Sequence, residues 1–177
     1  MKEVLSIIFN DVHLKNGNED EVYKSTIHMV DYAVENKIKN IIFAGDLFDS
    51  RTFQRQKVLQ TLDKMLDLFN ANGLTLYLFP GNHDKTIYSS SDSFLDIYRH
   101  HPCVKFNREL KNINIEGVSI DLLPFFSDEL LVPMLHEAKG ADVLISHFDM
   151  AGSTHLGHVS KKTTINPKLL SKWKKVY

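Results

Sequence analysis

The stretch LTLYLFPGNHD, residues 74–84, shows how this chain is organised. Its apolar first half ends at Pro80 and Gly81, and a short apolar run with such a boundary is typical of a buried β-strand. Asn82 and His83 then place ligand-capable side chains where the strand ends. Because open α/β folds bind ligands at the carboxyl ends of their strands, the segment predicts an active-site loop. Gly-Asn is also common turn chemistry, so this segment alone leaves a plain turn open.

Three other apolar runs end in the same way. The runs, each with the side chains that follow it, are 4–9 with Asp11 and His13, 40–44 with Asp46, and 143–145 with His147. The carboxyl ends of parallel strands meet at one edge of a sheet. If the four strands are parallel, the side chains that follow them converge on a single site.

Amphipathic helices separate the first three of these strands. Apolar residues recur at helical spacing over about 20–36 and about 54–70, and Gly73 follows the second segment as a C-terminal cap would. The expected buried stripes are Tyr23, Ile27, Val30 and Val34 in the first helix and Val58, Leu62, Met65 and Phe69 in the second. The strand–helix–strand–helix–strand order predicts right-handed crossovers and a parallel sheet.

The pattern changes in the second half of the chain. Short strands at hairpin spacing are expected at 104–106, 113–115 and 118–123, and short helices at 91–99 and 128–138, the latter containing Pro133. We therefore predict an α/β fold with two packed sheets, in which the first three strands are parallel and adjacent.

The composition is that of a single globular domain. The chain has 177 residues, of which 43% are hydrophobic and 24% charged, enough for a core of ordinary size. Cys103 is the only cysteine, so no internal disulfide can form, and no apolar run reaches the length of a membrane span. The N-terminus has no secretory signal pattern, so we expect a cytoplasmic protein without a membrane partner. Lysines without acidic residues follow Asp149, and such a basic end can meet a nucleic-acid backbone or be a solvated face.

The converging side chains are those of a metal centre. Carboxylates, imidazoles and an amide, without a thiolate, favour manganese, iron or zinc. Asp11 and His13 lie two residues apart, and on an extended segment they point to the same side and can share one ion. Asp46 has two oxygens and can bridge to a second ion, for which Asn82 and His147 complete the ligand set. Two such ions can clamp a phosphate and supply hydroxide at neutral pH.

His83 has a different expected role. Neighbouring side chains on an extended segment point apart, so His83 cannot easily be a ligand if Asn82 is one. It is better placed to act as a general acid that protonates the leaving oxygen of a substrate.

Together these motifs resemble those of the calcineurin-like dinuclear metallophosphoesterases. That family carries D-x-H, GD-x-x-D, GNH-[DE], a lone His and then G-H-x-H. The matching metal ligands are Asp11, His13, Asp46, Asn82 and His147, the matching catalytic histidine is His83, and Asp49 matches the acidic residue that orients this histidine in the phosphatase branches. The resemblance extends over nearly the whole chain and implies a four-layer α/β/β/α sandwich that holds two divalent metal ions, Mn²⁺ first among them and Fe or Zn as alternatives.

Within this family the chain is most similar to SbcD-type DNA-repair exonuclease subunits and their tailed-phage recombination endonuclease counterparts. The features are GDLFDSR at 45–51 instead of GD-x-x-DRG, GNHD instead of GNHE, and IDLLPF at 120–125. The resemblance implies hydrolysis of DNA phosphodiester bonds, as an exonuclease or endonuclease in repair or recombination. It implies DNA and an SMC-type ATPase subunit as partners, with a homodimer as a further option.

The final G-H-x-H motif of the family is missing from this sequence. His155 and His158 lie near His147, but their context, HLGH, does not match it. We therefore expect residues 1–177 to be the N-terminal part of the metallophosphoesterase domain, with its C-terminal portion missing and the second sheet incomplete. Two alternatives to a nuclease stay open: a phosphatase or cyclic phosphodiesterase for small substrates on the same fold, and a truncated inactive subunit that only binds a partner or DNA.

Overall fold

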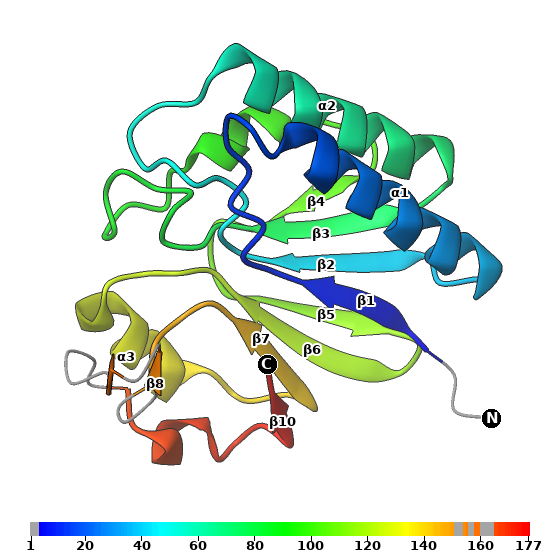
Figure 1. The fold of residues 1–177 in the computed structure, drawn as a ribbon. Coiled ribbons are helices and arrows are strands. Elements are labelled where there is room, and N and C mark those ends of the chain that lie inside the picture. Colours follow the sequence, from blue (N-terminus) through cyan, green and yellow to red (C-terminus); the bar gives the residue numbers. More distant parts are fainter. Residues whose placement is uncertain (1–3, 151–153, 156–157, 160–164) are drawn as a thin grey trace.

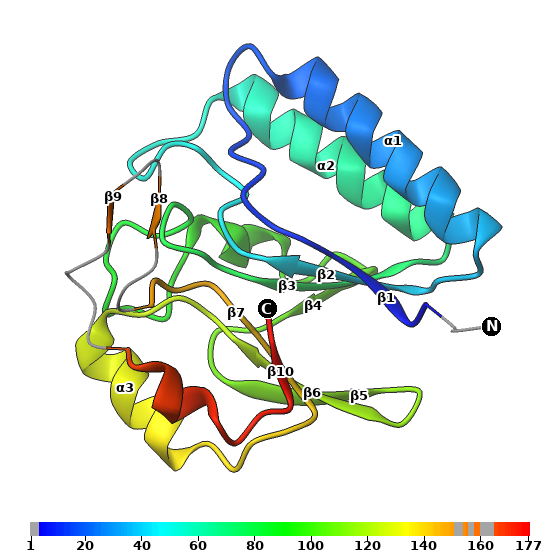
Figure 2. The ribbon, with the colours of Figure 1, turned by 60° about the horizontal axis from the view of Figure 1, so that its bottom comes forward.

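The chain folds into two packed β-sheets with helices on both outer faces (Figure 1 and Figure 2). The computed structural model describes residues 4–150, 154–155, 158–159 and 165–177. Helices α1 and α2 cover the first sheet, and α3 covers the second sheet on the opposite side of the molecule. This is the α/β/β/α sandwich that the motifs implied.

The first sheet has the strand order β1-β2-β3-β4, and all its strands are parallel. Its strands are β1 (Ser6–Phe9), β2 (Asn40–Ala44), β3 (Thr75–Phe79) and β4 (Val104–Phe106). The prediction of three parallel, adjacent first strands is confirmed. The strand expected at 104–106 is confirmed, but its hairpin pairing is wrong, because it pairs with β3 in parallel. Three residues of apolar spacing could not distinguish a parallel edge strand, reached through the 3₁₀-helix η1 (Phe94–Tyr98), from a hairpin strand.

The two long helices on the first sheet are α1 (Glu19–Glu35) and α2 (Gln56–Ala71). The stripe expected in α2 is confirmed, since all four of its residues are buried. In α1 the expectation is wrong at Val34, which is 50% exposed, whereas Ala33 is fully buried. The buried face of α1 is rotated by roughly 60° towards Thr26 and Ala33, at 100° per residue. Thr26 tolerates burial because its hydroxyl donates to the Val22 carbonyl at 2.9 Å, and a count of strongly apolar residues misses such a position.

The second sheet has the order β10-β7-β6-β5. Its strands are β5 (Lys111–Ile115), β6 (Val118–Leu123), β7 (Val143–Ser146) and β10 (Lys175–Val176), and only β5 and β6 are antiparallel. Helix α3 (Asp128–Glu137) continues through Pro133, and the 3₁₀-helix η2 (Pro167–Leu170) packs beside it. The incompleteness of this sheet stays a prediction. A short pair, β8 (Thr154–His155) with β9 (His158–Val159), contains the two HLGH histidines, whose side chains lie outside the described residues.

A shared apolar layer holds the two sheets together. It joins Ile42, Ala44 and Phe79 of the first sheet to side chains of the second, which are Ile115, Ile120, Leu122 and Ile145. Burial of each large aliphatic or aromatic side chain contributes about 1.5–3 kcal/mol. Because β2, β3 and β7 all contribute to this layer, the segments that follow them end close together.

The described part of the basic C-terminal segment is engaged in the fold. The ammonium of Lys172 donates to the carbonyls of Leu135, His136 and Ala138 at 2.7–2.9 Å, so it caps the C-terminus of α3. Lys174 pairs with Asp142 at 2.6 Å. These two lysines therefore stabilise the second sheet and its helix.

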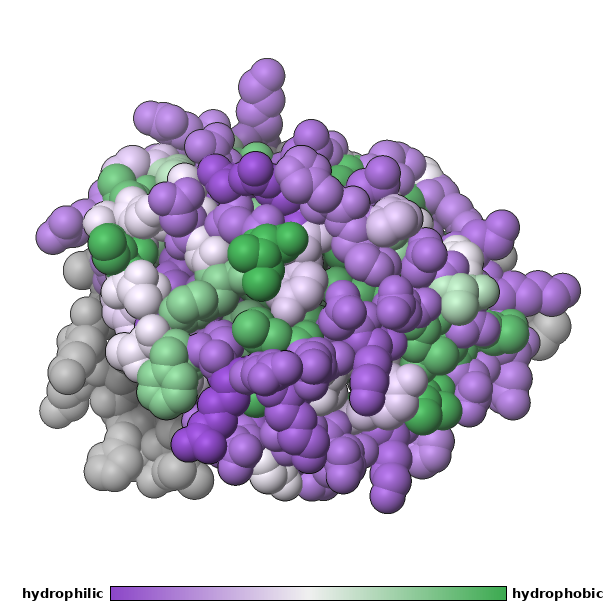
Figure 3. Space-filling view, turned by 90° about the horizontal axis from the view of Figure 1, so that it is seen from above, coloured by the Kyte–Doolittle hydropathy of each residue, from purple (hydrophilic) through white to green (hydrophobic). Residues whose placement is uncertain are grey.

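The outer face over α1 and α2 is mainly hydrophilic, and its apolar side chains are scattered in small groups (Figure 3). Across the described residues, no helix combines the length and the apolar character needed to cross a membrane.

Candidate metal centre

The loop after β1 is tied by its main chain to the loop after β2. The N–H of Asp11 donates to the carbonyl of Gly45 and the N–H of His13 to the carbonyl of Asp46, both at 3.1 Å. Asp11 and His13 have positive φ angles of 54° and 46°, so the expectation of an extended segment is wrong. Their side chains still converge, because His13 Nε2 lies 3.6 Å from Asp11 Oδ1.

Backbone strain gathers at these candidate ligands. Asp46 also has a positive φ, at 60°, and elsewhere in the described parts of the chain only the turn residues Lys37 and Glu116 share this among non-glycine residues. A left-handed conformation costs a non-glycine residue of the order of 1–3 kcal/mol. Such strain is a recognised feature of functional sites and persists only where the surrounding contacts fix it.

Two glycines let the loops after β2 and β3 touch. A Cβ on Gly81 would lie 2.2 Å from Asp46 Oδ1, and a Cβ on Gly45 would lie 2.8 Å from Gly81 Cα and 2.9 Å from Cγ of His147. Real Cβ atoms do not approach other atoms so closely, so a side chain at either position would displace a candidate ligand.

Asp84 is a fully buried carboxylate whose role sequence reasoning missed. Its Oδ2 accepts the N–H groups of Asp46 and Gly81 at 2.9 Å, and its Oδ1 accepts that of Phe48 at 3.0 Å. Burial raises the pKa of Asp84 to about 6, although the three donors favour the carboxylate. Asp84 thereby fixes the loops after β2 and β3 relative to each other. The acidic fourth position of GNHD was the available signal.

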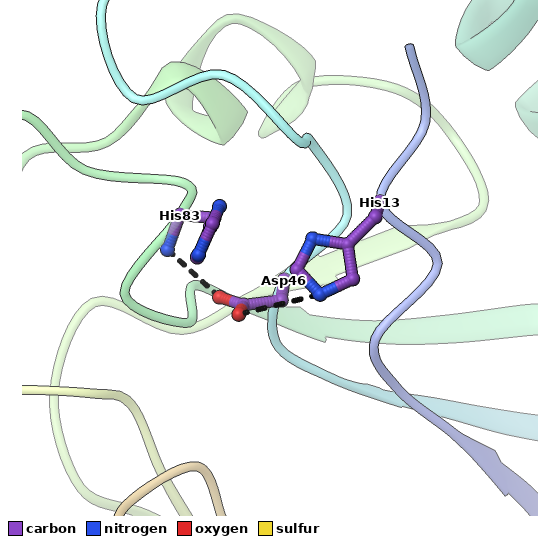
Figure 4. Close-up of side chains that lie close together, drawn as sticks. All are labelled: His13, Asp46 and His83. Carbon is purple, nitrogen blue, oxygen red and sulfur yellow. Dashed lines mark hydrogen bonds and ion pairs between the residues drawn. The ribbon is translucent and has the colours of Figure 1, made fainter. Parts of the chain in front are cut away.

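Asp46 lies at the centre of the site (Figure 4). Its Oδ1 accepts the N–H of His83 at 2.8 Å, and its Oδ2 lies 3.3 Å from His147 Nε2 and 3.9 Å from His13 Nε2. Burial opposes ionisation, but hydrogen bonding and charge from the histidines outweigh it, and the pKa of Asp46 is lowered. The site is therefore built around a buried carboxylate anion.

Within the described residues, the ligand-capable atoms of His, Asp and Glu side chains fall into two groups that share Asp46. One group contains His13, Asp46 and His83, the other contains Asp11, Asp46 and His147, and the ligand atoms within each group lie within 4.8 Å of one another. These groups differ from the expected ligand sets, because Asp11 falls with His147 and not with His13, and because His83 offers a ligand atom to the first group. The carboxylate of Asp46 is common to both groups, as a bridge between two ions requires.

The amide of Asn82 tests whether a cation fits this site. Its Oδ1 lies 3.0 Å from His147 Nε2 and faces the Asp46 carboxylate. His147 Nδ1 lies 3.0 Å from the Ala44 carbonyl, which can only accept, so Nδ1 carries a proton and Nε2 of the neutral ring carries a lone pair. Lone pairs of Asn82, His147 and Asp46 therefore face one another, an arrangement that a cation between them satisfies.

A proton or a turned amide satisfies the same atoms without a cation. Burial lowers the pKa of His147, but Asp46 outweighs this and the pKa is raised, so a proton on Nε2 competes with a cation. Alternatively, the Asn82 amide turned by 180° donates to His147 Nε2 at 3.0 Å and to Asp46 Oδ2 at 3.3 Å, and its oxygen accepts from Arg51 Nη2 at 2.7 Å. The donor set thus fits a divalent ion in one orientation of Asn82.

His83 belongs to the first group, and its ring lies edge-on to that of His13 at a centroid distance of 4.8 Å. Its Nδ1 lies 2.7 Å from the main-chain carbonyl of Asp49, so Nδ1 carries a proton. The carboxylate of Asp49 instead pairs with Lys15 at 3.2 Å and lies 3.9 Å from His13 Nδ1. His83 and Asp49 are therefore in contact. The main-chain carbonyl of Asp49 makes this contact, whereas the sequence had suggested its carboxylate. The catalytic roles of both residues stay predictions.

A cavity of about 870 Å³ opens beside these groups, lined by Asp11, Asn82 and His147 and by aromatic side chains that include Tyr88 and Phe125. It is large enough for a substrate whose reacting group lies at the ligands. Tyr88 was missed from the sequence, because an isolated tyrosine in a loop carries no motif.

Comparisons with known proteins agree with the motifs. The chain is 25% identical over 153 residues to exonuclease subunit 1 of Enterobacteria phage T4. The matched region covers 84% of this chain and 44% of that protein. The chain is 34% identical over 68 residues to the uncharacterized metallophosphoesterase YhaO of Bacillus subtilis (strain 168), which covers 37% of this chain and 16% of that protein. The chain thus spans less than half the length of these curated relatives.

Two solved structures are also similar. The nuclease MPE of Pseudomonas putida is 18% identical with a TM-score of 0.42, covering 67% of this chain and 52% of that chain. AQ665 from Aquifex aeolicus, a protein of unknown function, is 14% identical with a TM-score of 0.48, covering 96% of this chain and 93% of that chain. The family model for calcineurin-like phosphoesterases matches residues 6–173, and this chain belongs to that family.

Proposed function

We propose that this chain is the ligand-bearing part of a metal-dependent phosphodiesterase that hydrolyses DNA, as an exonuclease or endonuclease subunit in recombination or repair. The observation that carries the proposal is the carboxylate of Asp46, which is shared by two adjacent ligand groups. Family membership supports divalent metal ions, and the phage relative, which is an exonuclease subunit, supports DNA as the substrate.

The proposed ligands of two divalent ions are Asp11, His13, Asp46, Asn82 and His147, with Asp46 shared. Oxygen and imidazole donors without a thiolate suit Mn²⁺, and Fe or Zn are the alternatives. When bound, such ions neutralise charge on a phosphate and lower the pKa of water.

The proposed catalytic residues are His83 and Asp49. His83 would protonate the leaving oxygen from its Nε2, since Nδ1 is held by the Asp49 carbonyl. The carbonyl fixes the ring orientation and places the free nitrogen on the opposite side of the ring.

The proposed partners are DNA and an SMC-type ATPase subunit, with a homodimer as a further option and the cytoplasm as the compartment. The T4 relative is named as a subunit, which supports a partner protein. The matched region is 44% of that relative, which supports the proposal that residues 1–177 correspond to part of a longer metallophosphoesterase protein.

The test compares substrates in the presence of Mn²⁺. Linear duplex DNA, p-nitrophenyl phosphate and a cyclic nucleotide are incubated with the wild-type chain and with Asp46→Asn. We expect cleavage of DNA that stops with a chelator and is absent in Asp46→Asn.

Two results would favour the alternatives. Hydrolysis of the phosphate monoester or the cyclic nucleotide without DNA cleavage would indicate a small-substrate enzyme. Manganese binding without hydrolysis of any substrate would indicate a subunit that only binds DNA or a partner.

A further inference from the structure

The guanidinium of Arg51 lies next to the side chain of Asn82, one of the candidate ligands. Arg51 is exposed and lies in the loop between β2 and α2. Its Nη1 donates to the hydroxyl of Tyr88, and its guanidinium lies over the Tyr88 ring at 5.4 Å from the centroid. A hydrogen bond and a cation–π contact from one residue hold the guanidinium in a defined place. In the described part of the chain, no ion pair joins Arg51 to a carboxylate. The positive charge of Arg51 is therefore available to another anion.

Arg51 and a cation compete for the same amide. With its oxygen towards Arg51 Nη2, at 2.7 Å, the Asn82 amide turns its NH₂ group towards His147 and Asp46. With its oxygen towards His147 and Asp46, where a cation fits, the NH₂ group faces the guanidinium, donor against donor. Cation binding therefore takes an acceptor away from Arg51 and leaves its donors without one.

The surroundings of Arg51 suit a phosphodiester. Arg51 and Tyr88 line a cavity of about 430 Å³ together with Thr86, Ser127 and Glu129. Tyr88, Ser127 and Glu129 also line the cavity of about 870 Å³ beside the ligands. A diester carries two chains on one phosphorus, and two cavities that share the lining residues Tyr88, Ser127 and Glu129 offer space for both. Glu129 is the acidic side chain common to both linings, and the larger cavity is also lined by Asp11, Asp128 and Asp149, all of which oppose anion binding.

We propose that Arg51, positioned by Tyr88, binds a non-bridging oxygen of a substrate phosphodiester, and that cation binding releases Arg51 from Asn82 for this contact. The inference rests on the proposed function and deepens it, because it names the residue that recognises the phosphate. An arginine presents two parallel N–H donors to a phosphate, which gives direction as well as charge.

The test measures binding, so it does not depend on turnover. Calorimetry follows Mn²⁺ binding to the wild-type chain and to Arg51→Gln, Tyr88→Phe and Arg55→Gln. A second titration adds a thymidine dinucleotide with a phosphorothioate linkage to each protein in saturating Mn²⁺. Arg55 is the matched control, since it is an exposed arginine at the start of α2.

We expect Arg51→Gln to bind Mn²⁺ at least as tightly as wild type, because a neighbouring positive charge and a competitor for Asn82 are removed. Its affinity for the dinucleotide should fall about 10- to 100-fold, as for the loss of a hydrogen bond to a charged group. Tyr88→Phe, which keeps the ring, should lose about 3- to 10-fold, and Arg55→Gln should match wild type.

Each other result has a defined meaning. If Arg51→Gln and wild type bind the dinucleotide equally, Arg51 does not recognise the phosphate and the inference fails alone. If Arg51→Gln loses Mn²⁺ affinity, Arg51 supports the ligands and the inference also fails. If wild type binds Mn²⁺ but not the dinucleotide, the proposed function fails as well.

Discussion

The two sheets contribute unequally to the candidate centre. Loops that follow the parallel strands β1, β2 and β3 carry most of the ligand-capable side chains, and among the described residues the second sheet adds only His147 after β7. The strained backbone of Asp11, His13 and Asp46 also belongs to the first sheet. The polar contacts of the second sheet have a different character. Its buried Trp173 donates to Asp121 at 2.7 Å, and Lys172 caps α3.

This difference indicates that the first sheet carries most of the candidate metal ligands, whereas the second sheet mainly stabilises the fold. Parallel strands deliver several loops to one edge, so the first sheet can assemble ligands from distant parts of the sequence. The second sheet positions one histidine and uses its other polar groups to hold the fold. Substitutions in the loops of the first sheet should therefore change metal binding or reaction rate, whereas those in the second sheet should change the free energy of unfolding.

Replacement of His83 should give the largest effect. His83→Ala removes the proposed general acid, so hydrolysis of DNA in Mn²⁺ should slow by about 10²–10⁴-fold while manganese binding is kept. A p-nitrophenyl phosphodiester, whose leaving group needs no proton, should be affected much less. Loss of manganese binding, or equal loss on both substrates, would identify His83 as a ligand or a structural residue.

Lys85 joins the two regions, and its effect should depend on pH. Its buried ammonium donates to the carbonyls of Ser90 and Phe125, on loops that follow β3 and β6. Burial lowers its pKa from 10.5 to about 8. Between these pH values the unfolded chain binds more protons than the folded one, so this group makes the free energy of unfolding rise with pH.

The measurement is urea unfolding of wild type and Lys85→Met at pH 7.5 and pH 10.5. From one pH to the other, the difference between them should shift by about 3 kcal/mol in favour of wild type. Taking the difference cancels the other groups that titrate at high pH. A constant difference would show that Lys85 titrates normally in the folded protein.

Trp173→Phe should act on stability alone. It removes the indole N–H and leaves the buried oxygen of Asp121 without this donor, which costs about 1–3 kcal/mol of unfolding free energy. Manganese affinity should be unchanged, because Trp173 contacts the second sheet and not the ligands. A matching fall in manganese affinity would show that the second sheet shapes the site more than its one histidine indicates.

Asp49→Ala should give the smallest effect. The substitution removes the carboxylate, its exposed pair with Lys15 and its contact with His13 Nδ1 at 3.9 Å, but keeps the carbonyl that contacts His83. The hydrolysis rate should stay within about fivefold of wild type, the range of an exposed ion pair. A loss of rate as large as that of His83→Ala would show that the carboxylate of Asp49, and not its carbonyl, orients the His83 ring.

The sequence was sufficient for the strand order of the first half and for the residues that gather at its edge. Apolar runs that end in Asp, Asn or His predict both, because strand ends and ligands coincide in this fold. It was insufficient wherever the backbone decides the contact. The positive φ of Asp11 and His13, the N–H groups that Asp84 accepts and the carbonyl of Asp49 are properties of the folded main chain. Side-chain type and spacing carry no information about them.

If Asp46 joins two ion sites, its removal must affect both, and calorimetric titration of Mn²⁺ into wild type and Asp46→Ala measures this. We expect wild type to bind two ions and Asp46→Ala to lose affinity at both, because the shared carboxylate belongs to both ligand groups. Loss of only one ion would make Asp46 a ligand of a single site. Equal binding of Mn²⁺ by the two proteins would show that Asp46 is a ligand of neither ion.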